Sequence, residues 1–163
     1  MIKSTGGSEN VRIVLGDLDT RGTIGIVKPG SLVGKPLPNL KDLNIPGEQT
    51  DTNARPVLIC FFDMQQRPSR RCILQLAQQV DGLQSQGIRV LAVQSTKLDN
   101  NLLKAWITEN QISFPVGTLR SSEEEIRFAW GVKSLPWMIL TNDKHVVRAE
   151  GFGMDELDTK LKK

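Results

Sequence analysis

The sequence predicts an α/β fold in which a central mixed β-sheet is flanked by helices on both faces. A continuous apolar run at 57–62 is typical of a central strand that is buried on both sides. A helical pattern and a second apolar run at 89–93 follow it, and a strand–helix–strand order predicts a parallel pair. Two later apolar runs, at 137–140 and 146–149, flank an Asn-Asp turn and predict an antiparallel hairpin.

The first long helix is predicted to begin at Pro68. Proline suits the first turn of a helix, because its φ is already helical and its missing N–H has no intrahelical partner to lose there. The apolar residues that would face the core recur at helical spacing, at Ile73, Leu76, Ala77, Val80 and Leu83. Gly87 follows at the expected C-terminal cap, so the helix is predicted to end just before it.

Three further helices are predicted from their start signals and apolar spacing. Asp99 is placed to cap the first of them. Ser122 and Glu125 have the spacing of a capping box at the start of a second, short helix. The segment 155–163 carries two leucines four residues apart, which predicts a terminal amphipathic helix.

The N-terminal residues are predicted to be separate from this sheet. Alternating apolar residues at 11–15 and 23–27 predict a β-hairpin. We therefore expect residues 1–32 to form an N-terminal extension, or to be the last strands of a preceding domain, and residues 33–163 to form the α/β domain. The polar segment 44–55, which contains Pro and Gly, is predicted to be a loop.

Composition argues against several classes of function. The net charge of +3 is spread along the chain without a basic stripe, so no nucleic-acid partner is expected. No apolar run is long enough to span a bilayer, and the polar start does not resemble a signal peptide. Cys60, Cys72 and the single histidine, His145, cannot supply a four-ligand zinc site, and no metal or cofactor is expected. Because His145 lies in a turn, Ser-His-Asp and Cys-His catalysis are also disfavoured.

Several short segments, taken in order, resemble the thioredoxin-like superfamily. VGKPLPNL at 33–40 is similar to its Gly-x-Pro-x-Pro entry segment, and ISFPV at 112–116 to its Phe-Pro stretch. WGVKSLP at 130–136 is similar to its Tyr-Gly-Val-x-x-x-Pro loop. The likeness covers 33–163 and points to the extracytoplasmic TlpA/ResA branch and the AhpC/TSA branch. It implies a thioredoxin-like fold, descent from thiol oxidoreductases and an extracytoplasmic location.

The chain departs from this family at the redox motif. The family places Phe-Trp-Ala-x-Trp-Cys-x-Pro-Cys directly after the central strand, where this chain reads FFDMQQRPS at 61–69. Two phenylalanines and Pro68 set the register, so the resemblance puts Gln66 and Ser69 at the two cysteine positions. Dithiol chemistry requires two sulfurs, the first activated by the helix N-terminus. The segment Gln66-Arg67-Pro68-Ser69 is therefore predicted to be inactive as a dithiol.

Cys72 is the alternative nucleophile. It lies six residues after Gln66, near the predicted buried stripe of the helix, where an inert core thiol is the simpler interpretation. The peroxidase branch has Pro-x-x-x-Thr/Ser-x-x-Cys, and the segment from Ser69 to Cys72 matches its last four positions, whereas Gln65 replaces its proline. Cys60, within the central strand, is predicted to be a small core residue. A Cys60–Cys72 bond would require Cβ atoms within about 4.5 Å, which the sequence does not determine.

Two further features are candidate binding sites. Pro136 resembles the cis-proline that faces the active-site turn, and in the family the backbone of the preceding residue pairs with an extended peptide. Leu135-Pro136-Trp137 is therefore either a peptide groove or a loop kept for the fold alone. Arg67, Arg70 and Arg71 surround a helix start, where they are either an anion site or ordinary solvated side chains.

Two functions follow from these observations. The first is a non-redox binding or structural module of a larger protein, whose partner is a peptide or protein segment near Pro136. The alternative is a thiol oxidoreductase or peroxidase that uses Cys72, with Arg70 or Arg71 as activator. The first predicts no dithiol turnover, and the second predicts fast alkylation of Cys72 at neutral pH.

Overall fold

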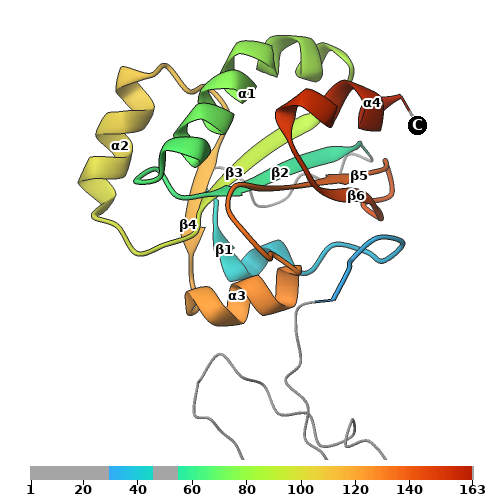
Figure 1. The fold of residues 1–163 in the computed structure, drawn as a ribbon, viewed down its shortest axis with the longest axis horizontal. Coiled ribbons are helices and arrows are strands. Elements are labelled where there is room, and N and C mark those ends of the chain that lie inside the picture. The colour runs from blue at the N-terminus through green and yellow to red at the C-terminus, as the bar shows by residue number, and fades with distance from the viewer. Residues whose placement is uncertain (1–29, 46–54, 163) are drawn as a thin grey trace, which may run out of the picture.

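The computed structural model describes residues 30–45 and 55–162. The hairpin predicted at 11–15 and 23–27 lies outside these residues, as does most of the loop predicted at 44–55. The described residues form a mixed sheet with helices on both faces, which confirms the predicted fold class (Figure 1).

The sheet has six strands in the order β1-β4-β3-β2-β5-β6. Strands β2, β3 and β4 run parallel to one another, whereas β1, β5 and β6 each pair antiparallel with their neighbours. The strands are β1 (Leu43–Asn44), β2 (Val57–Phe62), β3 (Arg89–Gln94), β4 (Val116–Leu119), β5 (Trp137–Thr141) and β6 (Val147–Phe152). The parallel pair and the closing hairpin are therefore as predicted.

Strand β2 lies between β3 and β5 because all of its residues are apolar, and all are buried. Successive side chains of a strand point to opposite faces of the sheet. Leu58, Cys60 and Phe62 consequently enter one core, whereas Val57, Ile59 and Phe61 enter the other. Each face of β2 needs its own cover of helices.

The helices α1 (Arg67–Ser85), α2 (Asn100–Glu109) and α4 (Leu157–Leu161) supply the cover of the first face. Their buried leucines pack on the sheet, among them Leu76, Leu103 and Leu157. The other face is covered by α3 (Glu123–Trp130), whose Trp130 ring lies 5.4 Å from that of Phe61 between centroids. Figure 1 shows α3 on the opposite side of the sheet from α1 and α4.

Helix α1 begins and ends as the sequence predicts. Gln66 is its N-cap residue with extended backbone angles, and Pro68 lies in the first turn. At the other end Gly87 has φ +84°, and its N–H donates to the carbonyl of Gln84 while that of Ile88 donates to Leu83. These two bonds form a Schellman motif, which needs a residue with positive φ and so favours glycine.

Two strands are missing from the sequence prediction. Strand β4 has only four residues, and β1 has two, at the start of the segment predicted to be a loop. Gly117 explains their pairing, because a Cβ there would lie 2.5 Å from the carbonyl oxygen of Asn44. Glycine lowers strand propensity, so the residue that allows this close approach also hides the strand from a pattern search.

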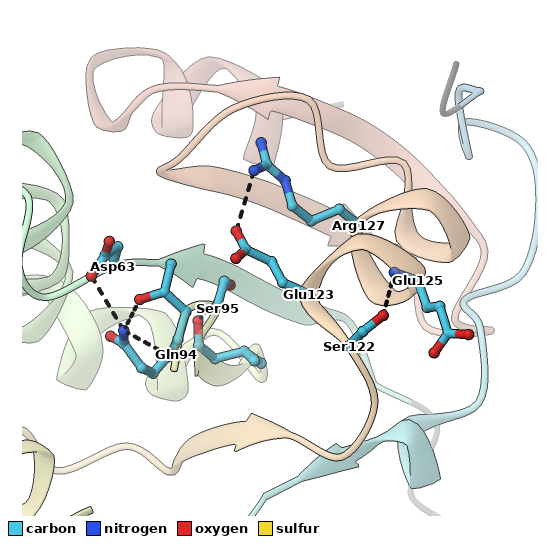
Figure 2. Close-up of polar contacts among 9 residues, drawn as sticks. Asp63, Gln94, Ser95, Ser122, Glu123, Glu125 and Arg127 are labelled. Carbon is cyan, nitrogen blue, oxygen red and sulfur yellow. Dashed lines mark hydrogen bonds and ion pairs between the residues drawn. The ribbon is translucent and has the colours of Figure 1, made fainter. Parts of the chain in front are cut away.

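The other helix signals agree with the structure, with one difference at the C-terminus. The side chains of Asp99 and Ser122 accept hydrogen bonds from the backbone N–H groups of Asn101 and Glu125, as caps do (Figure 2 for Ser122). The predicted terminal helix at 155–163 is divided into a 3-10 turn at Met154–Glu156 and α4. Within 30–45 and 55–162, no helix has the length and apolar character needed to cross a membrane.

Candidate functional site

The turn that leads from β2 into α1 places Gln66 and Ser69 in different environments. Gln66 is exposed at the N-cap, and its carbonyl accepts the N–H of Arg70 at 3.0 Å, the first bond of the helix. Ser69, three residues later, is completely buried. Its Oγ has no hydrogen-bond partner among the described residues. One position thus faces the solvent, and the other faces the interior of the first turn.

A buried polar cluster holds this turn in place. Gln94, at the end of β3, accepts the N–H of Met64 at 2.9 Å. It also donates to the carboxylate of Asp63 at 3.3 Å, as Figure 2 shows. Asp63 in turn accepts the N–H of Gln65 at 3.0 Å through its side chain. Both Asp63 and Gln94 are buried, so these bonds compete little with water. The start of α1 is therefore fixed to the ends of two parallel strands.

The three arginines at the start of α1 do not share one role. Arg70 donates from Nη1 to the backbone oxygen of Met64 at 3.0 Å, which adds a further bond to the turn. Arg67 and Arg71, four residues apart, are exposed and line a groove beside the helix. Of the three arginines of the sequence-predicted anion site, only Arg67 and Arg71 therefore line the groove.

This groove, with a volume of about 740 Å³, runs between α1 and the segment that follows β6. Its apolar lining comes from Pro136, Met138, Phe152 and Met154. Polar side chains of α1, including those of Gln75 and Gln79, line it on one side, and Asp155 lines it from the segment after β6. Such a mixture of apolar floor and polar rim is typical of a binding groove.

The structure brings only one residue of the predicted peptide site into the groove. Pro136, which follows a cis peptide bond, lines it. The side chains of Leu135 and Trp137 instead pack against the core on the α3 side of the sheet. The backbone of Leu135 forms no hydrogen bond with any other described residue. Its N–H and carbonyl are thus among the polar groups of this loop that an incoming strand could pair with.

Cys60 and Cys72 meet beneath the groove. Their sulfurs lie 3.9 Å apart, one from β2 and one from α1, and both thiols are free. Cys60 is completely buried, whereas Cys72 lines the groove and is 6% exposed. The hydrogen bond with Cys72, and burial after it, raise the pKa of Cys60 well above its usual value. The same hydrogen bond lowers the pKa of Cys72, and burial opposes this.

Cys72 therefore combines two properties that the sequence left as alternatives. It is a buried core thiol, as the simpler interpretation has it, and it also borders the groove that contains Pro136. Its neighbour Cys60 could not be chosen from spacing alone, since the two residues are twelve positions apart on different elements. The groove wall after β6, from Gly151 to Asp155, was missed as well, because no motif in that segment signals it.

Within the described residues, no cluster of three or more His, Cys, Asp or Glu side chains is suited to hold a metal ion. The groups that the site offers are two thiols, two exposed guanidinium groups, the Asp155 carboxylate, the amides of Gln75 and Gln79, and an apolar floor.

Comparison with known proteins agrees on the fold. No protein-family model matches the chain, and no curated protein matches it in sequence. Among solved structures, a domain of a possible thiol-disulfide isomerase from Cytophaga hutchinsonii is similar with a TM-score of 0.66 at 20% identity, over 82% of this chain and 92% of that one.

Two further solved structures show the same likeness. The thioredoxin domain of a thiol-disulfide oxidoreductase from Bacteroides vulgatus has a TM-score of 0.65 at 15% identity, over 82% of this chain and 97% of that one. StoA from Bacillus subtilis has a TM-score of 0.58 at 16% identity, over 72% of this chain and 92% of that one. At these identities the likeness is one of fold.

Proposed function

We propose, from the premise that this chain has a thioredoxin-like fold, that it is a binding module which holds an extended peptide in the groove beside Pro136. In this proposal the chain has lost the dithiol of its thiol-disulfide oxidoreductase relatives at the helix start. The observation that carries the proposal is the pair of environments at the start of α1. An exposed Gln66 and a buried Ser69 stand three residues apart where a dithiol motif would place an exposed and a buried sulfur.

Neither side chain can replace a redox cysteine. An amide has no ionisable atom in the accessible pH range, and a serine hydroxyl forms no disulfide. The buried Oγ of Ser69, which has no partner among the described residues, is consistent with a position inherited from a less polar sulfur. In this proposal the start of α1 therefore takes no part in electron transfer, and the function of the neighbouring groove is binding alone.

The occupant that fits the groove is an extended peptide with apolar and acidic side chains. The apolar floor of Met138, Phe152 and Met154 suits apolar side chains of the peptide. Arg67 and Arg71, at the rim, suit its carboxylates. The unpaired backbone of Leu135 provides a place for one pair of main-chain hydrogen bonds, as in strand addition.

The test is a titration of the reduced protein with peptides in which leucine alternates with glutamate, followed by NMR. Amide shifts are expected to move at residues that line the groove, on α1 and on 151–155. Replacing glutamate by lysine in the peptide is expected to weaken the binding, because the arginine rim then repels the peptide. Shifts that move nowhere, or only outside the groove, would refute the proposal.

Arg71→Glu provides the protein side of the test, with Arg120→Glu as its matched control. Both arginines are exposed, but Arg120 lies outside the groove. Loss of one attraction and gain of one repulsion, each worth about 0.5–1 kcal/mol at an exposed site, is expected to weaken binding about tenfold for Arg71→Glu. The control is expected to bind within a factor of about two of the original protein.

A second candidate function is thiol chemistry at Cys72. It is favoured by the lowered pKa of this thiol, by its place on the groove and by the two arginines that line the same groove. The test is the rate of alkylation by iodoacetamide in the folded protein at neutral pH, compared with the unfolded protein. Folded-state labelling slower than unfolded labelling would rule out an exposed catalytic thiol.

Domain organisation and location complete the proposal. Residues 33–163 would form the thioredoxin-like domain, with 1–32 as an extension that joins it to the rest of a larger protein. An extracytoplasmic location is supported by the resemblance to the TlpA/ResA branch. Fractionation of cells that produce the protein, with the full natural chain, is the experiment that tests this location.

A further inference from the structure

The two cysteines lie where the sheet and the first helix meet, well away from the helix start. Cys60 is in the middle of β2, opposite Ala92 of β3 and Met138 of β5. Cys72 is six residues beyond Gln66, which is about 9 Å along the helix axis at 1.5 Å per residue. The fold brings the two sulfurs to 3.9 Å from each other. Both cysteines belong to the apolar core between the sheet and α1.

We propose that Cys60 and Cys72 form a reversible intramolecular disulfide, a redox site displaced down the helix from the usual position and open to small disulfides through the groove. The sulfurs of a disulfide are about 2.05 Å apart, so those of Cys60 and Cys72 must approach by roughly 1.9 Å. Rotation of a short side chain about χ1 moves its sulfur atom over such distances.

The two thiols are unequal, which assigns their roles. Cys72 lines the groove and is the sulfur that a small disulfide reaches first. Its pKa is lowered by the hydrogen bond with Cys60, which favours the nucleophilic thiolate. Cys60 is completely buried, and its pKa is raised, so it remains protonated until the second step.

The reaction balances with a small-molecule disulfide as oxidant. The Cys72 thiolate attacks one sulfur of the disulfide, a Cys72–S bond forms, and the other half leaves as a thiolate. That thiolate, or water, takes the proton of Cys60, and the Cys60 thiolate then attacks the Cys72 sulfur. The protein disulfide forms, the second half of the small molecule leaves as a thiolate, and two electrons have passed from the protein to the oxidant.

The experiment is equilibration of the reduced full chain in mixtures of reduced and oxidised glutathione, followed by acid quenching, alkylation and mass spectrometry. We expect one two-electron transition, in which the protein loses two hydrogen atoms and both cysteines escape alkylation. Trypsin cleaves at Arg70 and Arg71, between the two cysteines, so a linked pair of peptides identifies the Cys60–Cys72 bond directly. A folded protein that keeps both thiols under excess oxidised glutathione would overturn the proposal.

Two variants test the assigned order. In Cys60→Ala we expect a glutathione adduct on Cys72 to accumulate, because no second thiol resolves it. In Cys72→Ala we expect Cys60 to remain reduced, since its side chain is inaccessible. An adduct on Cys60 instead would reverse the assignment and contradict the proposed route through the groove. The peptide map of the unsubstituted protein decides the bond itself, even where a variant fails to fold.

This inference is independent of peptide binding, which is measured in the reduced protein. Loss of peptide binding leaves the disulfide test intact, and absence of the disulfide leaves the binding test intact.

Discussion

The indole of Trp137 lies against Gly151 so closely that a Cβ at residue 151 would be 2.7 Å from Cη2 of the ring. Trp137 begins β5 directly after Pro136, and Gly151 lies in β6 with φ +72°. Both Pro136 and Gly151 line the groove. The wall of the groove therefore depends on a glycine for two reasons, its backbone angle and the ring beneath it.

Gly151→Ala is expected to destabilise the protein by about 2–4 kcal/mol. A positive φ costs a non-glycine residue about 1 kcal/mol, and a Cβ pressed against the indole adds about 1–3 kcal/mol of overpacking. Gly87→Ala is the matched control, because Gly87 also has positive φ, at +84°, but its Cβ would meet no atom within 4 Å. Urea unfolding measures the free energy of unfolding of both variants. An equal loss of stability in the two would contradict the contact between residue 151 and Trp137.

Ser69→Ala is expected to raise the free energy of unfolding by about 1 kcal/mol. The variant removes a buried hydroxyl that has no partner among the described residues, and burial of such a group costs about 1–3 kcal/mol. Ser122→Ala, the same substitution at the cap of α3, is expected to lower the free energy of unfolding by about 1 kcal/mol. Thermal or urea unfolding measures the change in the free energy of unfolding for each variant, and the two changes are expected to have opposite signs. A loss at Ser69 as large as that at Ser122 would mean that its hydroxyl is bonded after all.

The sequence reveals the elements whose apolar pattern is continuous and whose ends carry local signals. β2 is found because all six of its residues are apolar, and α1 because Pro68 and Gly87 bracket a helical stripe. β4 is not detected because it contains Gly117, and glycine lowers strand propensity. This glycine is needed for the close approach of β1, which lies next to β4 in the sheet. Local sequence patterns therefore indicate a residue's role in its own helix or strand, but they do not indicate its contacts with other elements.

The same distinction separates what is predictable at the site. The positions of Gln66 and Ser69 follow from the helix start, which is local. The meeting of Cys60 with Cys72 depends on how α1 rests on β2, which the sequence does not encode at short range. The division of the arginines, with Arg70 on the turn, follows from a bond to the backbone of Met64 that spacing alone does not indicate.

The alkylation rate of Cys72 is expected to rise with pH along a curve whose midpoint lies below the usual thiol pKa. Only the thiolate reacts, so the midpoint reports the pKa of Cys72, which its hydrogen bond with Cys60 lowers. In Cys60→Ala this bond is lost while burial remains, and the midpoint is expected to move to higher pH. Iodoacetamide kinetics followed by mass spectrometry measure both curves, and a midpoint that is the same in both proteins would remove Cys60 as the cause.

The sign of the associated effect on stability follows from the same shifts. A lowered pKa in the folded state means that the folded protein releases the Cys72 proton first, so this thiol adds stability as pH rises through the interval between its folded and unfolded pKa values. Cys60 has the opposite shift, so its contribution is present at lower pH and is lost as pH rises above the unfolded thiol pKa. Unfolding of the original protein and of Cys60→Ala across this range measures the combined contribution of the pair, because the hydrogen bond that is the largest cause of both shifts is absent from the variant.

Restoring cysteines at the helix start is the strongest test of the register. If Gln66 and Ser69 stand at the dithiol positions, Gln66→Cys/Ser69→Cys is expected to form a disulfide that dithiothreitol reduces, without loss of the fold. Both residues lie on one tryptic peptide that ends at Arg70, and this peptide also contains Cys60. The bond is therefore reported by a loss of two hydrogen atoms on that peptide together with an alkylated Cys60 in its fragment spectrum, while Cys72 is scored on the next peptide. Gln65→Cys/Ser69→Cys is the control, because it keeps the buried sulfur and moves the exposed one outside the helix cap. We expect the control to remain reduced at the glutathione ratio that oxidises the first variant, and the opposite result would shift the register by one residue and remove the basis for a lost dithiol.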